Sequence, residues 1–590
     1  MRPACPDIVA CFRQMLAALK EQPAADRYGY ACAVGVAAIE AYWNHLLSRH
    51  GSSWKLTPPV LDKPLPRLEA GARKAAGEVG LLAASSDPLF ASYLIGELYT
   101  ALLPDDLRAR HGIFYTPPAL ADRLLTLASQ AGADWSTAKV LDPACGGGAF
   151  LTPVAIKIVA SLRTRDASAL LDHIASHLRG FEIDPVGAWM SQAFVEAALL
   201  EPCLRAGRRL PPLVTMGDAL TMSPDSSVDL VIGNPPYGRV TLSPRLREVY
   251  KRSLYGHANI YGLFMDLGVR WTRPGGVLAY ITPTGFLGGQ YFKELRSLMS
   301  REAPPAGVDL VRSRKNVFSG VLQETLLAVY RRAAKPGPAA VHILALDSEG
   351  KVEVSPAGSF SLPRVPTEPW LVPRDLEQTS LIESVREMPH RLADYGYKVS
   401  TGPLVWNRHK PQLSDNLSRN SYPILWAECI AGNGRFEHRA EKLTHKPFLR
   451  LKSGQDWLLT QYPCVLLQRT TAKEQSRRLI AAVLPARLIR EYGAVVVENH
   501  LNIVKPFKKS PPVSLRVLAE LLNSETVDSV FRCINGSVAV SATELESLPL
   551  PPPEALQGLE ALLDRKAPSE EIQGYIRSLY SRRLEANAAA

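Results

Sequence analysis

The sequence has few of the features that mark secreted, membrane and metal-binding proteins. Its eight cysteines are spread over 590 residues without a Cys-X-X-Cys pair, which argues against a zinc cluster or a disulfide framework. No apolar run approaches the length of about 18 residues that a membrane-spanning helix needs, and the first residues lack the long apolar segment of an export signal. We therefore expect a cytoplasmic chain with no membrane partner.

Two catalytic signatures are also missing. The glycine-rich stretch described below is not followed by the Gly-Lys-Ser/Thr of a phosphate-binding loop. The N-terminal region carries no PD…(D/E)xK pattern, the mark of many metal-dependent nucleases. What the chain does have is positive charge, with a formal net charge of +11 and a sequence pI of about 9.2. This surplus favours a polyanionic partner without identifying it.

The length and the local patterns predict several domains. Residues 1–110 have helical spacing, and residues 111–335 alternate between strands and helices. Residues 336–385 have the composition of a linker with a little strand content, 386–555 are mixed α/β, and 556–590 form a helical tail. The alternating part implies an α/β fold with a doubly wound, mostly parallel sheet and functional residues at the carboxyl ends of its strands. We expect no site in the N-terminal helices.

The most informative segment is the apolar strand 228–233, which ends in Asn234, Pro235, Pro236 and Tyr237. The side-chain carbonyl of Asn234 and the backbone carbonyl of Pro235 can accept both hydrogens of an amino group, while the Tyr237 ring covers the substrate plane. Prolines fix φ and remove donors, so these acceptors stay aimed. The pattern predicts an enzyme that activates the amino nitrogen of a planar substrate.

Three carboxylates at predicted strand ends precede this Asn-Pro-Pro-Tyr segment, namely Asp142, Glu182 and Asp218. Asp142 leads into a turn with three consecutive glycines, through which the backbone can pass close to a ligand. Glu182 can accept ribose hydroxyls and Asp218 an exocyclic amine, so the set suits a nucleoside and would repel a diphosphate. Glu182 lies farther from the turn than the roughly 20 residues of compact nucleotide folds, so we expect an extra loop or helix at 163–178.

Taken in order, these motifs resemble the gamma-class N6-adenine DNA methyltransferases of restriction–modification systems, close to the TaqI-like and Eco-type II adenine-specific methylases. The resemblance covers about residues 90–335 strongly and 386–555 more loosely. It implies a Rossmann-like, class I S-adenosylmethionine-dependent fold with a helical N-terminal domain and a C-terminal target-recognition domain. It further implies S-adenosylmethionine as cofactor, double-stranded DNA as partner, and methyl transfer to a flipped adenine without a metal.

The resemblance also implies roles for individual residues. Tyr115 and Thr116 lie at the methionine carboxylate, Glu182 holds the ribose, and Asp218 binds the adenine amine of the cofactor. The positions that match the family's cofactor-binding motifs are Tyr115, Thr116, Asp142, Pro143, Ala144, Cys145, Gly146, Glu182, Ile183, Asp218, Ala219 and Pro236. Asn234, Pro235 and Tyr237 are the catalytic residues, and Phe318 stacks on the target base.

Candidate residues for reading DNA lie in the C-terminal region. Residues 399–408 resemble the opening of the family's recognition domains, and residues 432–435 look like a loop that presents an arginine. Arg to guanine and Asn to adenine are the productive major-groove pairings. The candidates are Trp406, Asn407, Arg408, Arg435, Arg469 and Asn499.

These features imply a type II modification enzyme that protects host DNA, with a cognate restriction endonuclease encoded separately. Two alternatives stay open. One is a bifunctional restriction–modification polypeptide, which would need a nuclease site. The other is a methyltransferase that acts on RNA or on a protein glutamine through the same Asn-Pro-Pro-Tyr shelf. A catalytically idle DNA-binding subunit is disfavoured, because Asn234, Glu182 and Asp218 are all present.

Overall fold

The computed structural model divides the chain into two units, which are described separately. The first comprises Met1–Phe286 and Tyr291–Pro356, and the second Leu287–Gln290 and Ala357–Ala590. No helix among the described residues has the length and apolarity needed to cross a membrane. The structure describes residues 6–104, 107–108, 115–312, 324–347, 351–386, 388–440, 445–470, 477–534 and 539–588.

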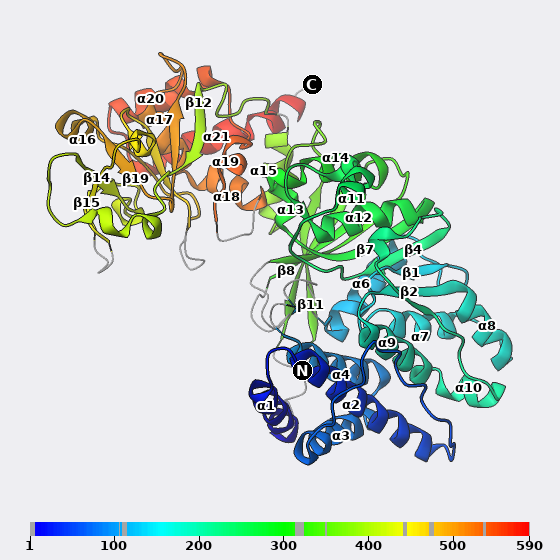
Figure 1. Cartoon of the computed structure of the whole chain (residues 1–590). Coiled ribbons are helices and arrows are strands. Elements are labelled where there is room, and N and C mark those ends of the chain that lie inside the picture. The colour runs from blue at the N-terminus through cyan, green and yellow to red at the C-terminus, as the bar shows by residue number, and fades with distance from the viewer. Residues whose placement is uncertain are drawn as a thin grey trace. The chain divides into compact units, whose positions relative to one another are not determined.

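The N-terminal part of the first unit is helical, as its Ala- and Leu-rich spacing predicts. The side chain of Asp87 caps one helix by accepting the backbone N–H groups of Leu89 and Phe90. The helices bury a shared core that also contains Met190 and Phe194 of a later helix. They are α1 (Pro6–Glu21), α2 (Arg27–Arg49), α3 (Ala70–Ala84) and α4 (Pro88–Leu102) (Figure 1).

A large sheet forms the centre of the first unit. Among the described residues it has nine strands in the order β11-β10-β8-β9-β7-β4-β1-β2-β3. Every pairing along β7-β4-β1-β2-β3 is parallel, whereas β9 runs antiparallel to both its neighbours. The strands are β1 (Val140–Asp142), β2 (Leu178–Glu182), β3 (Val214–Met216), β4 (Val228–Gly233), β7 (Thr272–Pro283), β8 (Pro305–Val311), β9 (Thr325–Arg331), β10 (Ala339–Leu346) and β11 (Val352–Phe360).

Helices connect and cover these strands, and a short hairpin, β5 (Arg239–Val240) with β6 (Ala258–Asn259), lies outside the sheet. The extra element expected at 163–178 is present as α8 (Ala167–His177). The other helices are α6 (Pro118–Gln130), α7 (Leu151–Ser161), α9 (Pro185–Ala198), α10 (Leu200–Ala206), α11 (Pro244–Val249), α12 (Ile260–Trp271), α13 (Gly285–Gly288) and α14 (Lys293–Glu302). The predicted α/β class with a mostly parallel, doubly wound sheet is confirmed.

The segment 336–385, expected as a linker with a little strand content, forms regular elements over much of its length. Its first half forms β10, which pairs in parallel with β8, and β11, the outermost strand of the large sheet. Its second half contains the helix α15 (Glu377–Arg386). In β10 the side chains of Ala339, Val341, Ile343 and Leu344 are buried, so the segment supplies residues to the protein interior.

The second unit is mixed α/β, as predicted. Its described residues form a four-stranded sheet (β12-β20-β17-β18) and a five-stranded sheet (β13-β15-β14-β19-β16). The strands are β12 (Tyr397–Thr401), β13 (Leu413–Ser414), β14 (Ser421–Leu425), β15 (Phe448–Arg450), β16 (Leu459–Thr460), β17 (Val465–Gln468), β18 (Ala481–Val483), β19 (Val495–Val497) and β20 (Leu501–Pro506). The helices after α15 are α16 (Ala486–Tyr492), α17 (Leu515–Leu522), α18 (Glu525–Ile534), α19 (Ala542–Glu546), α20 (Gln557–Asp564) and α21 (Ser569–Ala588).

The segment 556–590, expected as a separate tail, is part of this unit. Leu559, Ile576 and Tyr580 are buried in one core with Val504 and Phe531. The sequence could not show this, because a helix with an apolar face does not reveal what that face packs against.

Candidate functional site

The carboxyl ends of β4, β1, β2 and β3 lie next to one another, because these strands are parallel neighbours. After β1 the chain runs outward through β2 and β3 and then returns to β4 on the other side of β1. Such a switch point is the usual ligand site of an open α/β sheet. Asp142 ends β1, Glu182 ends β2, and Asp218 and Asn234 follow β3 and β4. The structure thus brings together the four residues that the sequence singled out.

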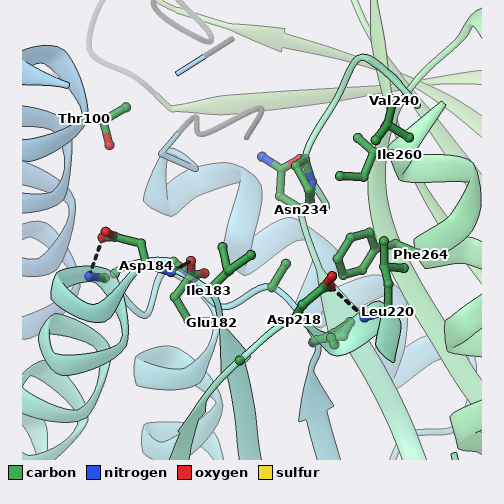
Figure 2. Close-up of a pocket in the computed structure, with 18 of the residues that line it drawn as sticks. Thr100, Glu182, Ile183, Asp184, Asp218, Leu220, Asn234, Val240, Ile260 and Phe264 are labelled. Atoms are coloured by element: carbon green, nitrogen blue, oxygen red, sulfur yellow. Dashed lines mark hydrogen bonds between the residues drawn. The ribbon is translucent and has the colours of Figure 1, made fainter. Parts of the chain in front are cut away.

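A cavity of about 340 Å³ lies at this edge of the sheet (Figure 2), which is large enough for a cofactor or drug-sized ligand. Figure 2 shows Phe264, Val240 and Ile260 across the cavity from Glu182 and Asp184. The described residues of the lining include carboxylates but no Lys, Arg or His. Of the predicted residues, those that line it are Tyr115, Pro143, Ala144, Gly146, Glu182, Ile183, Asp218, Ala219, Asn234 and Pro236.

The carboxylate of Glu182 is held in place by backbone donors. Its Oε2 accepts from the N–H of Gly146 at 2.8 Å, and its Oε1 accepts from the N–H of Asp184 at 2.9 Å. Burial raises the pKa of Glu182 to about 7, although these N–H groups act in the opposite direction. A carboxylate has about four acceptor positions, so Glu182 retains capacity for hydroxyl groups of a ligand.

Asp142 lies behind the cavity wall. It is buried, and its Oδ1 accepts from the N–H of Ala144 at 3.1 Å. The Oδ2 atom has no hydrogen-bond partner among the described residues, and burial raises the pKa of Asp142 to about 8. This carboxyl group therefore shapes the first turn after β1, and its predicted contact with a cofactor stays a prediction.

Asp218 and Ile183 offer the polar and apolar parts of a slot for a flat ring. The Oδ1 of Asp218 accepts from the N–H of Leu220 at 2.9 Å and so orients the carboxylate. The side chain of Ile183 is 50% exposed, which is unusual for isoleucine. With Phe264 across the cavity, this arrangement suits a nucleobase whose amino group faces a carboxylate.

Asn234 is oriented by two hydroxyl groups. Its Nδ2 donates to the Oγ1 of Thr116 at 3.1 Å, and its Oδ1 accepts from the hydroxyl of Tyr237 at 2.6 Å. Thr116 is buried just before α6, and its contact with the methionine end of a cofactor, which the resemblance implies, stays a prediction. The two bonds fix the amide plane, and the second lone pair of Oδ1 can still accept a substrate hydrogen.

The Tyr237 ring is only 7% exposed and packs edge-on against Tyr261. Burial raises the pKa of Tyr237, so its hydroxyl keeps its proton and donates. The predicted stacking of this ring on a base stays a prediction. Pro235 is buried, and Phe318, the second predicted stacking residue, lies outside the described residues.

Cys145 does not line the cavity, because its side chain is buried and packs into the core. Its place at the methionine end, which the resemblance implies, stays a prediction. A Cβ atom at Gly180 would lie 2.9 Å from its Sγ and 2.7 Å from Leu151, so the thiol fills the space beside β2. Sequence spacing locates the turn but cannot tell which of its side chains face the ligand.

The N-terminal helices also contribute to the cavity, contrary to expectation. Gly96, Tyr99 and Thr100 of α4 line it. A Cβ atom at Gly96 would lie 2.0 Å from the ring of Tyr115, whose hydroxyl donates to the carbonyl of Gly147 at 3.0 Å. A lone glycine within an apolar helix was the signal that could have revealed this close approach.

In the second unit, hydrogen bonds join several predicted DNA-reading positions. The Arg469 guanidinium donates to the backbone carbonyl of Asn499. The backbone N–H of Asn499 donates in turn to the carbonyl of Leu404, which lies just before the short helix Trp406–Arg408. Asn407 and Arg408 are exposed. Arg435 is also exposed, in a turn that Gly434 closes with a φ of 79°. These positions stay candidates, because the structure contains no nucleic acid.

Comparison with known proteins agrees with this site. Residues 215–318, which contain Asp218 and Asn234, match the family described as the Eco57I restriction-modification methylase. The chain is 27% identical over 344 residues to the type II methyltransferase M.BsuBI of Bacillus subtilis, covering 55% of this chain and 66% of that protein. It is 26% identical over 337 residues to M.PstI of Providencia stuartii, covering 56% and 66%. Both matches span just under two thirds of the relative's length.

A solved structure extends the likeness to the fold of most of the chain. The type IIL restriction-modification enzyme MmeI in complex with DNA aligns over 98% of this chain and 96% of its own, with a TM-score of 0.55 and 12% identity. Part of the sheet domain, residues 215–318, is therefore similar to the Eco57I restriction-modification methylase family, and just over half of the chain is similar to type II methyltransferases.

Proposed function

We propose that this protein transfers a methyl group from S-adenosylmethionine to the N6 atom of an adenine in double-stranded DNA, at a specific sequence, as the modification enzyme of a type II system. The observation that carries the proposal is the position of Asn234. Its amide lines the same cavity as Glu182 and Asp218, so a nucleoside cofactor and a target amino group can meet at one edge of the sheet.

The cavity fits S-adenosylmethionine. Glu182 would hold the ribose hydroxyls, and Asp218 would accept the adenine amine beside the apolar face of Ile183. The acidic lining also suits a sulfonium cation, since carboxylates favour a positive charge nearby. When bound, this cofactor would supply an electrophilic methyl group: the S–CH3 bond would break as the N6–CH3 bond forms, the cofactor would leave as a neutral thioether, and one N6 proton would pass to water.

The residues of this chain act on the amino group. The Oδ1 of Asn234 and the carbonyl of Pro235 would accept its two hydrogens, which draws the nitrogen lone pair out of conjugation with the ring. The bonds from Tyr237 and to Thr116 keep the acceptor in place before substrate arrives, so little reorganisation is needed during the reaction. Cys145 is buried outside the cavity, which leaves it no role as a nucleophile.

Target adenine must leave the duplex to reach this site, at a cost of a few kcal/mol. Contacts to phosphates from the basic chain, with its net charge of +11, would supply part of that energy. The residues Arg408, Arg435 and Arg469 would take part in reading the sequence. The family that residues 215–318 match is described as a restriction-modification methylase, so we also propose a separately encoded cognate endonuclease as a functional partner.

The test is incubation of the purified chain with tritiated S-adenosylmethionine and, in parallel, plasmid DNA, total RNA or a glutamine-containing peptide. We expect label on DNA alone, and protection of that DNA from one sequence-specific endonuclease. Label on RNA or peptide but not on DNA would contradict the proposal. A further reaction with magnesium and unmodified DNA separates modification alone, which leaves the plasmid intact, from a bifunctional enzyme, which cuts it.

A further inference from the structure

The segment between β2 and α9 is held by side chains from the N-terminal helices. The carboxylate of Asp184 accepts from the hydroxyl of Tyr28 at 2.6 Å on Oδ1 and from the hydroxyl of Tyr99 at 2.9 Å on Oδ2. The N–H of Gly187 also donates to Oδ2, at 2.7 Å, so that Asp184 caps α9. Donors from α2, α4 and α9 thus converge on one carboxylate.

The environments of Tyr28 and Tyr99 keep both hydroxyl groups protonated, so that they remain hydrogen-bond donors. Burial raises the pKa of both Tyr28 and Tyr99, and the nearby charge of Asp184 raises the pKa values further. Tyr99 is 4% exposed, so water cannot easily take over its bond to the carboxylate. A hydrogen bond to a charged acceptor in such a setting is among the stronger ones in proteins.

Asp184 is connected directly to the predicted ribose ligand. Its backbone N–H donates to the Oε1 of Glu182, and both residues line the cavity. Tyr99 of α4 lines it as well, and the neighbouring Thr100 is labelled in Figure 2. Movement of Asp184 would therefore move the carboxylate of Glu182 away from the N–H of Gly146 that holds its other oxygen.

The packing between the N-terminal helices and α9 does not depend on these hydroxyl groups. Val186, Met190 and Phe194 of α9 share one apolar core with the N-terminal helices, including Trp43 and Ile95. A change that removes only a hydroxyl leaves this core intact. The bonds to Asp184 therefore add positional control rather than the bulk of the stability.

We propose that Tyr28 and Tyr99 are positioning residues of the cofactor site, which act through Asp184 to hold Glu182 in its ribose-binding position. The N-terminal helices are then a required wall of that site. This inference rests on the proposed function, because it takes the ribose of S-adenosylmethionine as the ligand of Glu182. The inference goes beyond the proposed function because it assigns a role to the N-terminal helices, which lie outside the matched methylase segment 215–318.

The test compares Tyr28→Phe, Tyr99→Phe and the double variant of the full chain with Tyr30→Phe. Tyr30 is a matched control because it is buried on α2 and its hydroxyl has no hydrogen-bond partner within the described ranges. Calorimetry gives the Kd for S-adenosylmethionine, steady-state methylation gives KM and kcat, and circular dichroism with thermal melting reports folding. The single variants remain informative if the double variant does not fold.

We expect the Kd and the KM for S-adenosylmethionine to rise about tenfold in the double variant, which corresponds to about 1.4 kcal/mol. The kcat at saturating cofactor should change far less, since the target-base acceptors are untouched. Tyr30→Phe should match the wild type. The inference is overturned if folded Tyr28 and Tyr99 variants bind the cofactor as tightly as the wild type, or if they lose kcat and affinity equally. Failure of the wild type to bind the cofactor at all would instead remove the proposed function, and this inference with it.

Discussion

Replacing Thr116 by valine tests how Asn234 is held. Valine keeps the shape of the side chain but removes the Oγ1 that accepts from the Asn234 amide at 3.1 Å. Thr116 is 3% exposed, so water has little access to the vacated position. Leaving a buried donor unpaired costs about 1–3 kcal/mol, and the amide would turn to recover a partner.

If that cost falls on the transition state, kcat drops about 5- to 150-fold, since each 1.36 kcal/mol is a factor of ten in rate. Single-turnover methylation with tritiated S-adenosylmethionine measures the rate, and calorimetry measures cofactor affinity. Thr116→Ser, which retains the hydroxyl, should recover most of the activity. The reasoning is refuted if the valine and serine variants turn over equally fast. A higher Kd for the cofactor with an unchanged kcat would support the sequence-based role of Thr116 at the methionine end.

Three further predictions follow from the cavity and its surroundings. The pKa of Glu182 is raised to about 7, and its ionised form is the better acceptor, so cofactor affinity in calorimetry should fall about tenfold per pH unit below pH 7. The variant Glu182→Gln should bind the cofactor weakly at every pH, without this pH dependence. A wild-type affinity that does not change with pH would contradict the ribose-binding role of Glu182. Burial raises the pKa of Asp142 from 3.8 to about 8, so the folded protein keeps a proton that the unfolded chain loses, and stability falls as the pH rises through this window. Asp142→Asn should therefore raise the melting temperature of the ligand-free protein at pH 8 but not near pH 4, and an equal change at both would count against it. A glycine-to-alanine change in a helix is normally favourable by about 1 kcal/mol. Gly96→Ala in α4 should instead lower the melting temperature and weaken cofactor binding, because the new methyl group would lie 2.0 Å from the Tyr115 ring. A stabilised variant with normal cofactor binding would show that the Tyr115 ring moves aside at no cost.

The edge of the sheet that carries the site could be predicted because the pattern that indicates it lies within short segments of the sequence. Apolar runs ended in Glu182 and Asn234, and parallel strands place such ends together. The length of the segment between the glycine turn and Glu182 predicted an extra loop or helix, which the structure shows as the helix α8. None of these inferences needed knowledge of which distant segments touch.

The remaining features depend on contacts between distant parts of the chain. The Asn234–Thr116 bond joins residues 118 positions apart, and the direction of the Cys145 side chain is decided by how tightly β2 packs beside the turn. The wall formed by α4 could not be predicted either, because its helical pattern shows that a face is buried but not against what. Some strand content was expected in the segment of β10 and β11, but its composition could not show that these strands join the large sheet.

The central claim is that the oxygen acceptors at the end of β4 activate an adenine amine. The most direct measurement is nucleoside mass spectrometry and modification-sensitive sequencing of plasmid DNA treated with the wild type and with Asn234→Ala. We expect N6-methyladenine in one sequence context for the wild type, and none for the variant although it still binds S-adenosylmethionine. A wild-type protein that binds both cofactor and DNA yet leaves adenine N6 unmodified, or a variant that methylates at the wild-type rate, would contradict the claim.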